Sequence, residues 1–267
     1  MKRSFMFICA AALLLTGCGA SADEASAQLF AMDTVMQLDA YGHQVKQAVS
    51  DAEETIQALE ARLSRTREDS LVSVLNQNGA AQDLSAAEQA LLSEALTFRD
   101  ATGGAFDITI APVMDAWGFT GDSYRVPAQD ELDALLENVN SDEIRLSGSS
   151  VTLGARQAID LGGIAKGYTS DCVEAVFREN KIESGKISLG GNVFVLGGKP
   201  DGADWRVGIR DPQDENALAA VLTLRDAYAI TSGGYERYFT ENGNTYHHII
   251  DPSTGYPADS GLLSVTV

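Results

Sequence analysis

Residues 160–167 read Asp-Leu-Gly-Gly-Ile-Ala-Lys-Gly, and this segment follows an apolar, strand-like run and opens a predicted helix. Two adjacent glycines allow backbone N–H and C=O groups to approach a ligand closely. The start of a helix points unsatisfied N–H groups and a positive dipole at the same place. With Asp160 and Lys166 beside it, the segment favours binding of a phosphate group, with or without a metal ion. It lacks the G-x-G-x-x-G spacing of dinucleotide sites and the G-K-[ST] ending of a P-loop, so a simple glycine-rich chain reversal stays open.

The N-terminus predicts export from the cytoplasm. Lys2 and Arg3 precede an apolar run, Phe5–Leu15, which is too short to span a bilayer and is typical of a signal peptide. Residues 15–18, Leu-Thr-Gly-Cys, resemble a bacterial lipoprotein box, which implies cleavage before Cys18 and a lipid on its sulfur. We therefore expect a lipoprotein signal peptide at residues 1–17, a flexible tether at residues 18–27, and a lipid-anchored protein on the extracytoplasmic face of the cell membrane. An ordinary secretory signal with an incidental cysteine is the alternative.

The charge of the chain restricts its partners. With 19 basic and 38 acidic residues, the formal net charge is −19. Such a surface disfavours nucleic acid and anionic lipid, so an anionic ligand needs local help from a metal ion, a lysine or a helix start. If Cys9 leaves with the signal and Cys18 carries lipid, Cys172 has no partner for an internal disulfide and is expected as a small buried side chain on a helix.

Hydrophobic periodicity predicts mainly helices in the first half of the chain. Apolar residues after Val45 recur at spacings of three and four, and Ser85 with Glu88 forms a capping-box pattern. The predicted elements are a strand at Leu29–Tyr41 and helices at Val45–Ser64, from Ser70 onward, at Ser85–Thr102 and from Pro127 to about Asn138.

From Ile144 onward the pattern changes to short strands separated by glycine turns, with one helix at Ala165–Asn180. The expected strands are Ile144–Leu146, Val151–Leu153, Ala158–Leu161, Lys186–Leu189, Val193–Leu196, Trp205–Ile209, Ala219–Leu224, Tyr228–Thr231, Tyr246–Ile250 and Leu263–Val267. Their close spacing implies largely antiparallel pairing. Runs of helices next to runs of strands favour an α+β fold.

Several motifs occur together and in order along nearly the whole chain. They are Ala31-Met32-Asp33-Thr34, residues 102–108 (Thr-Gly-Gly-Ala-Phe-Asp-Ile), residues 160–167, Leu189-Gly190-Gly191-Asn192, residues 230–237 (Ile-Thr-Ser-Gly-Gly-Tyr-Glu-Arg) and residues 247–255 (His-His-Ile-Ile-Asp-Pro-Ser-Thr-Gly). In this combination the chain resembles the ApbE family, the FAD:protein FMN transferases. The resemblance implies a two-lobed fold over residues 28–267, mostly antiparallel sheet with flanking helices.

The resemblance also implies an activity. FAD and Mg²⁺ would bind in a cleft between the lobes, and FMN would be moved onto a Thr hydroxyl of a target protein with release of AMP. The implied targets are subunits of membrane redox pumps and other flavoproteins that face the same compartment and carry a short acceptor motif. Two other functions stay open, a Mg²⁺-dependent FAD pyrophosphatase and a lipid-anchored flavin-binding protein without turnover.

Particular residues take implied roles by their place in the motifs. The resemblance implies that Met32 packs on the flavin, that the backbone carbonyl of Gly163 coordinates Mg²⁺ and that His248 serves the activity. The implied FAD contacts are Ala105, Phe106, Asp107, Asp160, Lys166 and Ile250.

The sequence departs from the family pattern at two places. Thr66 stands where some members have an aromatic residue that stacks on FAD. Family chains continue beyond the segment that matches Leu263–Val267 into a tail with metal ligands in D-x-x-x-T spacing. The resemblance therefore implies a domain that is truncated at its C-terminus, with an open sheet edge there.

The residue types suggest how the chemistry would proceed. Breaking a diphosphate depends mainly on charge neutralisation, which Mg²⁺, Lys166 and the helix start after Gly163 would supply. A base is needed for the acceptor hydroxyl, with His248 as the first candidate and Asp251 as the second.

Each of these assignments has a structural alternative. His248 could be a neutral, hydrogen-bonded histidine of a strand. Asp107 and Asp160 could be metal-proximal carboxylates, or a turn cap and a strand-end residue. Trp117 and Phe119 are expected to pack in the core rather than stack on the flavin.

Overall fold

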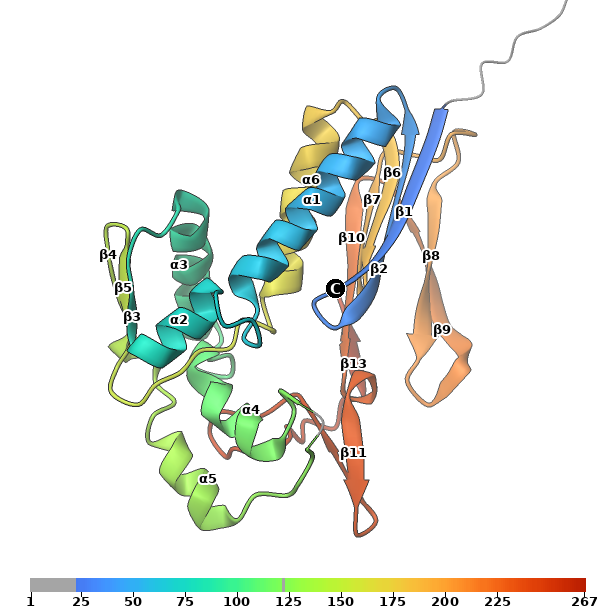
Figure 1. Ribbon diagram of the computed structural model, residues 1–267. Coiled ribbons are helices and arrows are strands. Elements are labelled where there is room, and N and C mark those ends of the chain that lie inside the picture. Colours follow the sequence, from blue (N-terminus) through green and yellow to red (C-terminus); the bar gives the residue numbers. More distant parts are fainter. Residues whose placement is uncertain (1–22, 122) are drawn as a thin grey trace, which may run out of the picture.

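A computed structural model describes residues 23–121 and 123–267 (Figure 1). In chain order the elements are β1 (Asp23–Ala31), β2 (Thr34–Gly42), α1 (Val45–Leu63), α2 (Leu71–Asn78), β3 (Ala80–Ala81), α3 (Ala86–Ala101), η1 (Ile108–Ile110), α4 (Ala111–Trp117), α5 (Gln129–Leu136), η2 (Ser141–Glu143), β4 (Arg145–Ser147), β5 (Ser150–Thr152), α6 (Ala165–Glu179), β6 (Ser184–Leu189), β7 (Asn192–Leu196), β8 (Trp205–Asp211), β9 (Asp214–Leu224), β10 (Ala227–Gly233), η3 (Gly234–Glu236), β11 (Tyr238–Glu241), β12 (Asn244–His247) and β13 (Ser264–Thr266), where η marks a 3₁₀ helix. The expected α+β class with mostly antiparallel sheet is confirmed.

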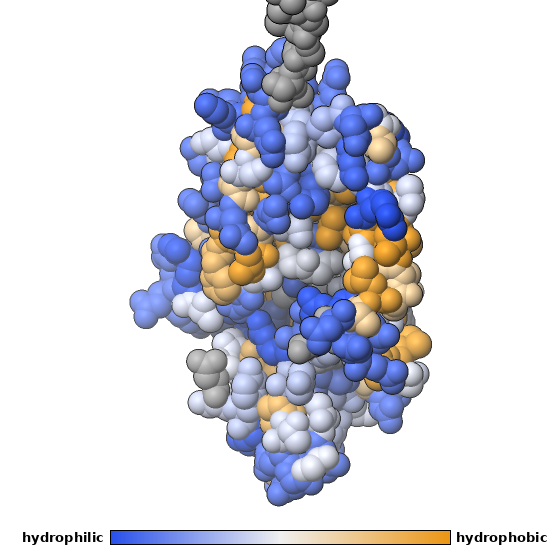
Figure 2. Space-filling model, turned by 90° about the vertical axis from the view of Figure 1, so that its right-hand side faces the viewer, coloured by the Kyte–Doolittle hydropathy of each residue, from blue (hydrophilic) through white to orange (hydrophobic). Residues whose placement is uncertain are grey.

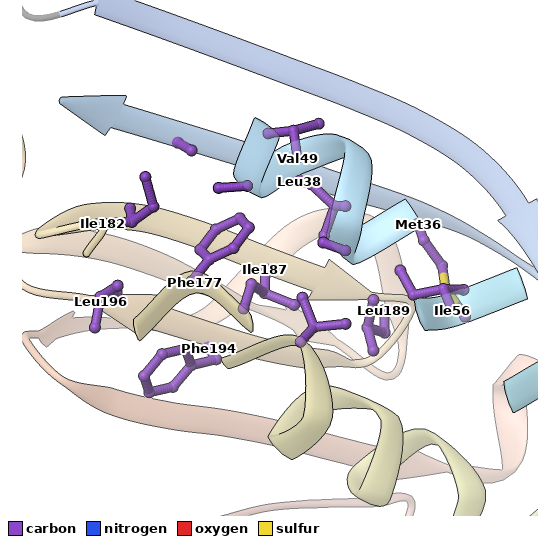
Figure 3. Packing of buried hydrophobic residues seen from close by; sticks show 14 of the residues in the cluster. Met36, Leu38, Val49, Ile56, Phe177, Ile182, Ile187, Leu189, Phe194 and Leu196 are labelled. Carbon is purple, nitrogen blue, oxygen red and sulfur yellow. The ribbon is translucent and has the colours of Figure 1, made fainter. Parts of the chain in front are cut away.

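Six antiparallel strands form one side of the molecule, in the order β1-β2-β6-β7-β10-β13, and the long helices α1 and α6 cover one face of this sheet (Figure 1). Alternation along the strands turns one set of side chains toward these helices. Met36 and Leu38 of β2 meet Ile56 of α1 and Phe177 of α6 in a core from which water is excluded (Figure 3). Burying each such side chain contributes about 1.5–3 kcal/mol, so this core holds the sheet and both helices as one unit.

A helical lobe lies beside the sheet and has a core of its own (Figure 1). It contains α2, α3 and the small sheet β3-β5-β4. The predicted capping box is confirmed, because Ser85 Oγ accepts the N–H of Glu88 at 3.2 Å while the Glu88 carboxylate accepts the N–H of Ser85 at 2.8 Å. Ser70 likewise caps α2 by accepting the N–H of Ser73 at 2.9 Å.

An aromatic cluster joins α4 to the β11–β12 hairpin. Trp117 is fully buried there, and its indole Nε1–H donates to the carbonyl of Gly255 at 2.7 Å. The rings of Phe239, Tyr246 and Tyr256 surround it at centroid distances of 6.2, 5.2 and 5.3 Å. The prediction that Trp117 packs in the core is confirmed, and the same holds for Phe119, which is 1% exposed.

The predicted strand Leu29–Tyr41 is wrong as a single element, since the chain reverses within it. Met32 and Asp33 both adopt left-handed backbone angles, with φ of 49° and 58°, and form a two-residue hairpin turn between β1 and β2. A Met-Asp pair carries no turn signal of the Asn-Gly kind, so the alternation of the sequence masked the turn. The predicted tether is also wrong for residues 23–27, because this stretch pairs with residues 38–42 as the first half of β1.

Three further predictions change in detail. Ala158–Leu161 is extended but pairs with no strand, because the Asn76 side chain accepts the Ile159 N–H at 2.7 Å and donates to its carbonyl at 2.9 Å in place of a neighbouring strand. The residue that caps α5 is Ala128, so Pro127 precedes that helix. The short helix α4 was not expected. Tyr246–Ile250 shortens to β12 plus a single bridge from Ile250 to Pro257.

The predicted signal peptide, Cys18 and the first part of the tether lie outside the described residues. Within 23–121 and 123–267, no helix has both the length and the apolar character needed to cross a bilayer.

Candidate functional site

The glycine corner, defined here as residues 160–163, leads from the helical lobe into α6. Ile159, just before the corner, and Leu161, within it, are buried in the core of that lobe. The carbonyl of Leu161 accepts two N–H groups, those of Ile164 at 2.9 Å and Ala165 at 2.8 Å, and so closes the turn that starts the helix. Gly162 and Gly163 therefore lie exposed on a rigid support. A Cβ at Gly163 would come within 2.9 Å of the Phe106 ring, which explains why glycine fits there.

The corner presents backbone polar groups that have no partner. In the described part of the chain, nothing donates to the carbonyl of Gly163, and nothing accepts the N–H groups of Lys166 and Gly167 in the first turn of α6. A free carbonyl suits a cation, and free N–H groups at a helix start suit an anion. These free groups are consistent with Gly163 as an oxygen ligand of a metal ion and with a phosphate at the helix start, and both stay predictions.

Asp160 does not stand free beside the corner, because both carboxylate oxygens have partners. Its Oδ1 accepts the Gly162 N–H at 2.7 Å, and its Oδ2 accepts from Arg65 at 2.9 Å. Of the two alternatives for this residue, the structure favours a carboxylate that shapes the turn. Sequence reasoning missed Arg65, whose only signal was its place beside Thr66 at the end of the first long helix; Thr66 itself is exposed.

Lys166 projects from the first turn of α6 toward a group of charged residues from other elements. Burial lowers the pKa of Lys166 and Arg237 lowers it further, whereas Glu236 and Asp33 oppose the shift. Arg237 in turn donates to Asp33 at 3.2 Å and to the carbonyl of Phe119 at 3.0 Å. Arg237 is already paired with Asp33, whereas no ion pair holds Lys166 within the described residues, so Lys166 is the cation that an anionic ligand would meet.

Met32 reaches the same region from the hairpin turn between β1 and β2. Its sulfur accepts the hydroxyl of Thr169 on α6 at 3.6 Å, and its backbone N–H donates to Glu60 of α1 at 3.0 Å. Asp33, next in the turn, is the partner of Arg237. The structure therefore brings the hairpin turn and the start of α6 together, as the predicted roles of Met32 and Lys166 require.

His248 is half-buried against Phe119, with ring centroids 6.4 Å apart. Its Nδ1 lies 3.1 Å from the carbonyl of Arg237, and since a carbonyl only accepts, Nδ1 carries the proton and Nε2 keeps a free lone pair. Burial lowers the pKa of His248, and the neighbouring charges of Arg237, His247 and Lys166 lower it further. The ring is therefore neutral at neutral pH and has the form that a general base needs. His247 points elsewhere, with its ring against Gly234.

Asp107 is 6% exposed and acts as a cap, so the structure favours the turn-capping alternative over a metal-proximal carboxylate, while its implied FAD contact stays a prediction. Oδ1 accepts the N–H of Thr109 at 2.8 Å, the hydroxyl of Thr109 at 2.6 Å and the hydroxyl of Ser141, while Oδ2 accepts the N–H of Ser141 at 3.1 Å. The turn-capping alternative is the one that the structure shows. Ala105 and Phe106 remain exposed or half-buried beside the corner.

Asp251 is occupied at one oxygen, since its Oδ1 accepts both the N–H and the hydroxyl of Ser253, at 2.8 and 2.7 Å. This is a local turn, so Asp251 is a weaker base candidate than His248. Ile250 is 9% exposed, and its side chain packs in the aromatic cluster. A ligand could therefore contact only the backbone of Ile250. No group of three or more His, Cys, Asp or Glu side chains with metal-binding geometry occurs in the part of the chain that the structure describes.

Comparisons with known proteins identify the family of this chain. The model of the ApbE family matches residues 32–267. The FAD:protein FMN transferase of Treponema pallidum (strain Nichols) is 34% identical over 84% of this chain and 67% of its own length, and that of Vibrio cholerae is 29% identical over 99% and 82%. Among solved structures, the ApbE protein of Thermotoga maritima superposes with a TM-score of 0.85 at 30% identity, covering 91% of this chain and 81% of its own. The flavin transferase ApbE from Vibrio cholerae gives 0.81 at 26% identity, covering 92% and 82%. The motifs, the fold and a family match over most of the chain agree, and the chain belongs to the ApbE family.

Proposed function

We propose that this chain is an FAD:protein FMN transferase, which moves FMN from FAD onto a Thr hydroxyl of a target flavoprotein and releases AMP. The observation that carries the proposal is the glycine corner together with the start of α6, where the free carbonyl of Gly163 meets the free N–H groups of Lys166 and Gly167. The charge of Lys166 also acts on His248. Relatives that cover most of this chain bear the same name, which supports the reaction class.

The diphosphate of FAD is the part of the substrate that the corner would hold. The N–H groups of Lys166 and Gly167 would donate to its oxygens, and the helix start would add a favourable field. Because burial disfavours the charged form of Lys166, an anion next to it restores that charge and is bound more tightly. The isoalloxazine ring would then extend toward Met32 in the hairpin turn.

The transfer step needs one proton acceptor and one leaving group. Nε2 of His248 takes the proton of the acceptor Thr hydroxyl. The threonine oxygen then forms a new bond to the phosphorus that belongs to the FMN half of FAD. The bond between that phosphorus and the bridging oxygen breaks, and AMP leaves with the electron pair. Hydrogen bonding of Nδ1–H to the Arg237 carbonyl keeps Nε2 free for this role.

We include Mg²⁺ in the proposal as the ion that would bind at the corner. Whether the ion fits here depends on the carbonyl of Gly163. Gly163 is exposed, and no described residue donates a hydrogen bond to its carbonyl oxygen. Mg²⁺ commonly uses few protein ligands together with substrate phosphates and water, so one such oxygen fits the ion. When bound, the ion would neutralise charge that develops on the diphosphate.

The acceptor is expected to be a flavoprotein domain that faces the extracytoplasmic side, such as a subunit of a membrane redox pump. This part of the proposal requires that Cys18 carries lipid and holds the enzyme at the same membrane. Access for a protein substrate is compatible with the surface: Phe30 and Val35, a cross-strand pair beside the hairpin turn, are 71% and 53% exposed. Hydrophobic residues also gather about half-way down the face shown in Figure 2, between more hydrophilic regions above and below.

The proposal is tested by incubating the full chain with FAD, Mg²⁺ and a candidate acceptor domain. Covalent flavin fluorescence on the acceptor after denaturing electrophoresis is expected, together with an equal amount of AMP and none on an acceptor whose Thr is replaced by Val. AMP and FMN released at the same rate without any acceptor would instead identify an FAD pyrophosphatase. Tight FAD binding without AMP would identify a binding protein.

A matched pair of variants separates the role of the corner from general charge effects. Lys166→Met should lose most of the transfer activity, whereas Lys46→Met, which removes the same charge from an exposed position at the start of α1, should retain it. Equal activity in both variants would contradict the proposed phosphate site.

A further inference from the structure

Arg65 is a buried cation in the segment between α1 and α2, and its guanidinium joins three residues that are distant in the sequence. Nη1 donates to Asp160 Oδ2 and to the Thr120 hydroxyl, both at 2.9 Å, and Nη2 donates to Asp115 Oδ2 at 2.8 Å. Only 12% of the side chain is exposed. Asp160 belongs to the glycine corner, whereas Asp115 and Thr120 belong to α4 and the segment that follows it.

The backbone of Arg65 is held as firmly as its guanidinium. The hydroxyl of Ser73 donates to the Arg65 carbonyl at 2.8 Å, and that of Ser70 donates to the Ser64 carbonyl at 2.5 Å. Within the described residues, the buried Nε–H of Arg65 finds no acceptor. The two terminal nitrogens therefore set the orientation of the guanidinium, at the expense of the third donor.

This contact reaches the ligand-binding backbone through one intermediate. Arg65 occupies Oδ2 of Asp160 and so leaves Oδ1 directed at the N–H of Gly162, which it accepts at 2.7 Å. Gly162 precedes Gly163, whose carbonyl is the free oxygen of the corner. Because glycine has wide backbone freedom, an outside contact is needed to fix the direction of that carbonyl.

We infer that Arg65 is a positioning residue for the flavin nucleotide: it fixes the carboxylate of Asp160, and through it the backbone of the glycine corner, and ties this corner to the segment after α4. The inference rests on the proposed function, since it assigns FAD as the ligand of the corner. Arg65 acts through Asp160, in contrast to Lys166, whose backbone and ammonium would meet the ligand directly.

The test compares FAD affinity and transfer kinetics in Arg65→Gln, Arg65→Lys and the wild-type chain. Arg65→Gln should raise the FAD dissociation constant and KM by about tenfold or more, the factor that corresponds to one hydrogen bond between charged groups. Its kcat at saturating FAD should fall less than its kcat/KM. Arg65→Lys should lie between the two, because an ammonium can pair with Asp160 but cannot span all three partners.

Arg62→Gln is the matched control, since Arg62 lies one turn earlier on α1 and forms an exposed ion pair with Glu88, away from the corner. This variant should bind FAD with wild-type affinity. A cycle with Asp160→Asn adds a readout that mere destabilisation would not move. If Arg65 acts through Asp160, the protein that carries both Arg65→Gln and Asp160→Asn should bind FAD as tightly as the single variant with the lower FAD affinity.

The possible outcomes separate the inference from the proposed function. Additive losses of affinity in the cycle, or a folded Arg65→Gln protein with FAD affinity within twofold of wild type, would overturn it. Tight FAD binding by wild type without labelling of any acceptor would refute only the proposed transfer reaction, because the affinity comparison still holds. A wild-type chain that binds no FAD would refute both.

Discussion

Replacing Asp107 by alanine distinguishes a structural cap from a ligand-binding carboxylate. The change removes an acceptor from four donors, the N–H and hydroxyl groups of Thr109 and Ser141, all of them buried. Hydrogen bonds to a charged group are worth about 1.5–3 kcal/mol each, and donors left without a partner in the interior add to the loss. Because the four bonds share two oxygens they are not additive, and we expect Asp107→Ala to lower the free energy of unfolding by about 3–5 kcal/mol.

The assay is urea unfolding followed by tryptophan fluorescence and circular dichroism. With a denaturant dependence of about 2–3 kcal/mol per molar, the expected loss shifts the unfolding midpoint by about 1–2.5 M. The control is Asp201→Ala, which removes the same kind of turn contact, Oδ1 to the N–H of Ala203 at 3.0 Å, from an exposed position and should cost less than about 1 kcal/mol. A midpoint for Asp107→Ala that matches the control, accompanied by a large loss of FAD affinity in the folded protein, would refute the assignment of Asp107 as a cap.

The other predictions concern pH and packing. Because the pKa of His248 is lowered in the folded protein, the free energy of unfolding should fall as pH drops below about 6.5, the ordinary value for histidine, and kcat/KM should fall at a lower pH, where His248 of the folded protein takes up its proton; a pH–rate profile with the same acid limb in His248→Gln would contradict this. Trp117→Phe should lower the free energy of unfolding by about 2–4 kcal/mol, through the lost indole hydrogen bond and the space left in the aromatic cluster, as measured by urea titration. Gly118→Ala should cost about 2–4 kcal/mol, since φ is +81° and the new Cβ would lie 2.2 Å from the carbonyl oxygen of Ser123; Gly79→Ala, with φ of +68° and open space, should cost about 1 kcal/mol in the same titration. Equal losses for the two glycines would rule out the clash.

Asp107 shows that the partners of a carboxylate do not follow from its motif position alone. Asp107 and Asp160 have similar sequence contexts, a carboxylate next to paired glycines. In the structure both are used internally, one to cap η1 and one to bind Arg65. A carboxylate's partners depend on which donors the fold brings to it, and neither Ser141 nor Arg65 is near its partner in the sequence.

The hairpin at Met32 and Asp33 illustrates a second limit. Alternation of apolar and polar residues is the same on both sides of a two-residue turn, so the pattern alone suggests one long strand. The turn is stabilised from elsewhere, by Glu60 of α1 and by Arg237. Those contacts offset the left-handed backbone angles, to which Met32 is poorly suited and Asp33 is better suited.

The sequence by itself determined the local features of this protein: the amphipathic helix α1, the capped start of α3, the glycine corner followed by α6, the α+β class and, through the order of its motifs, the family. The helices, the cap and the glycine corner are each encoded within about ten to twenty neighbouring residues, where periodicity, capping and glycine chemistry act directly, and the class and the family follow from the order of such local features along the chain. Only the tertiary structure decided which side chains serve the site. The pairs Arg65–Asp160 and Asp33–Arg237 join residues 95 and 204 positions apart. Such contacts exist because packed elements bring distant charges into a partly buried place, where an unpaired charge is costly, and no local pattern contains that information.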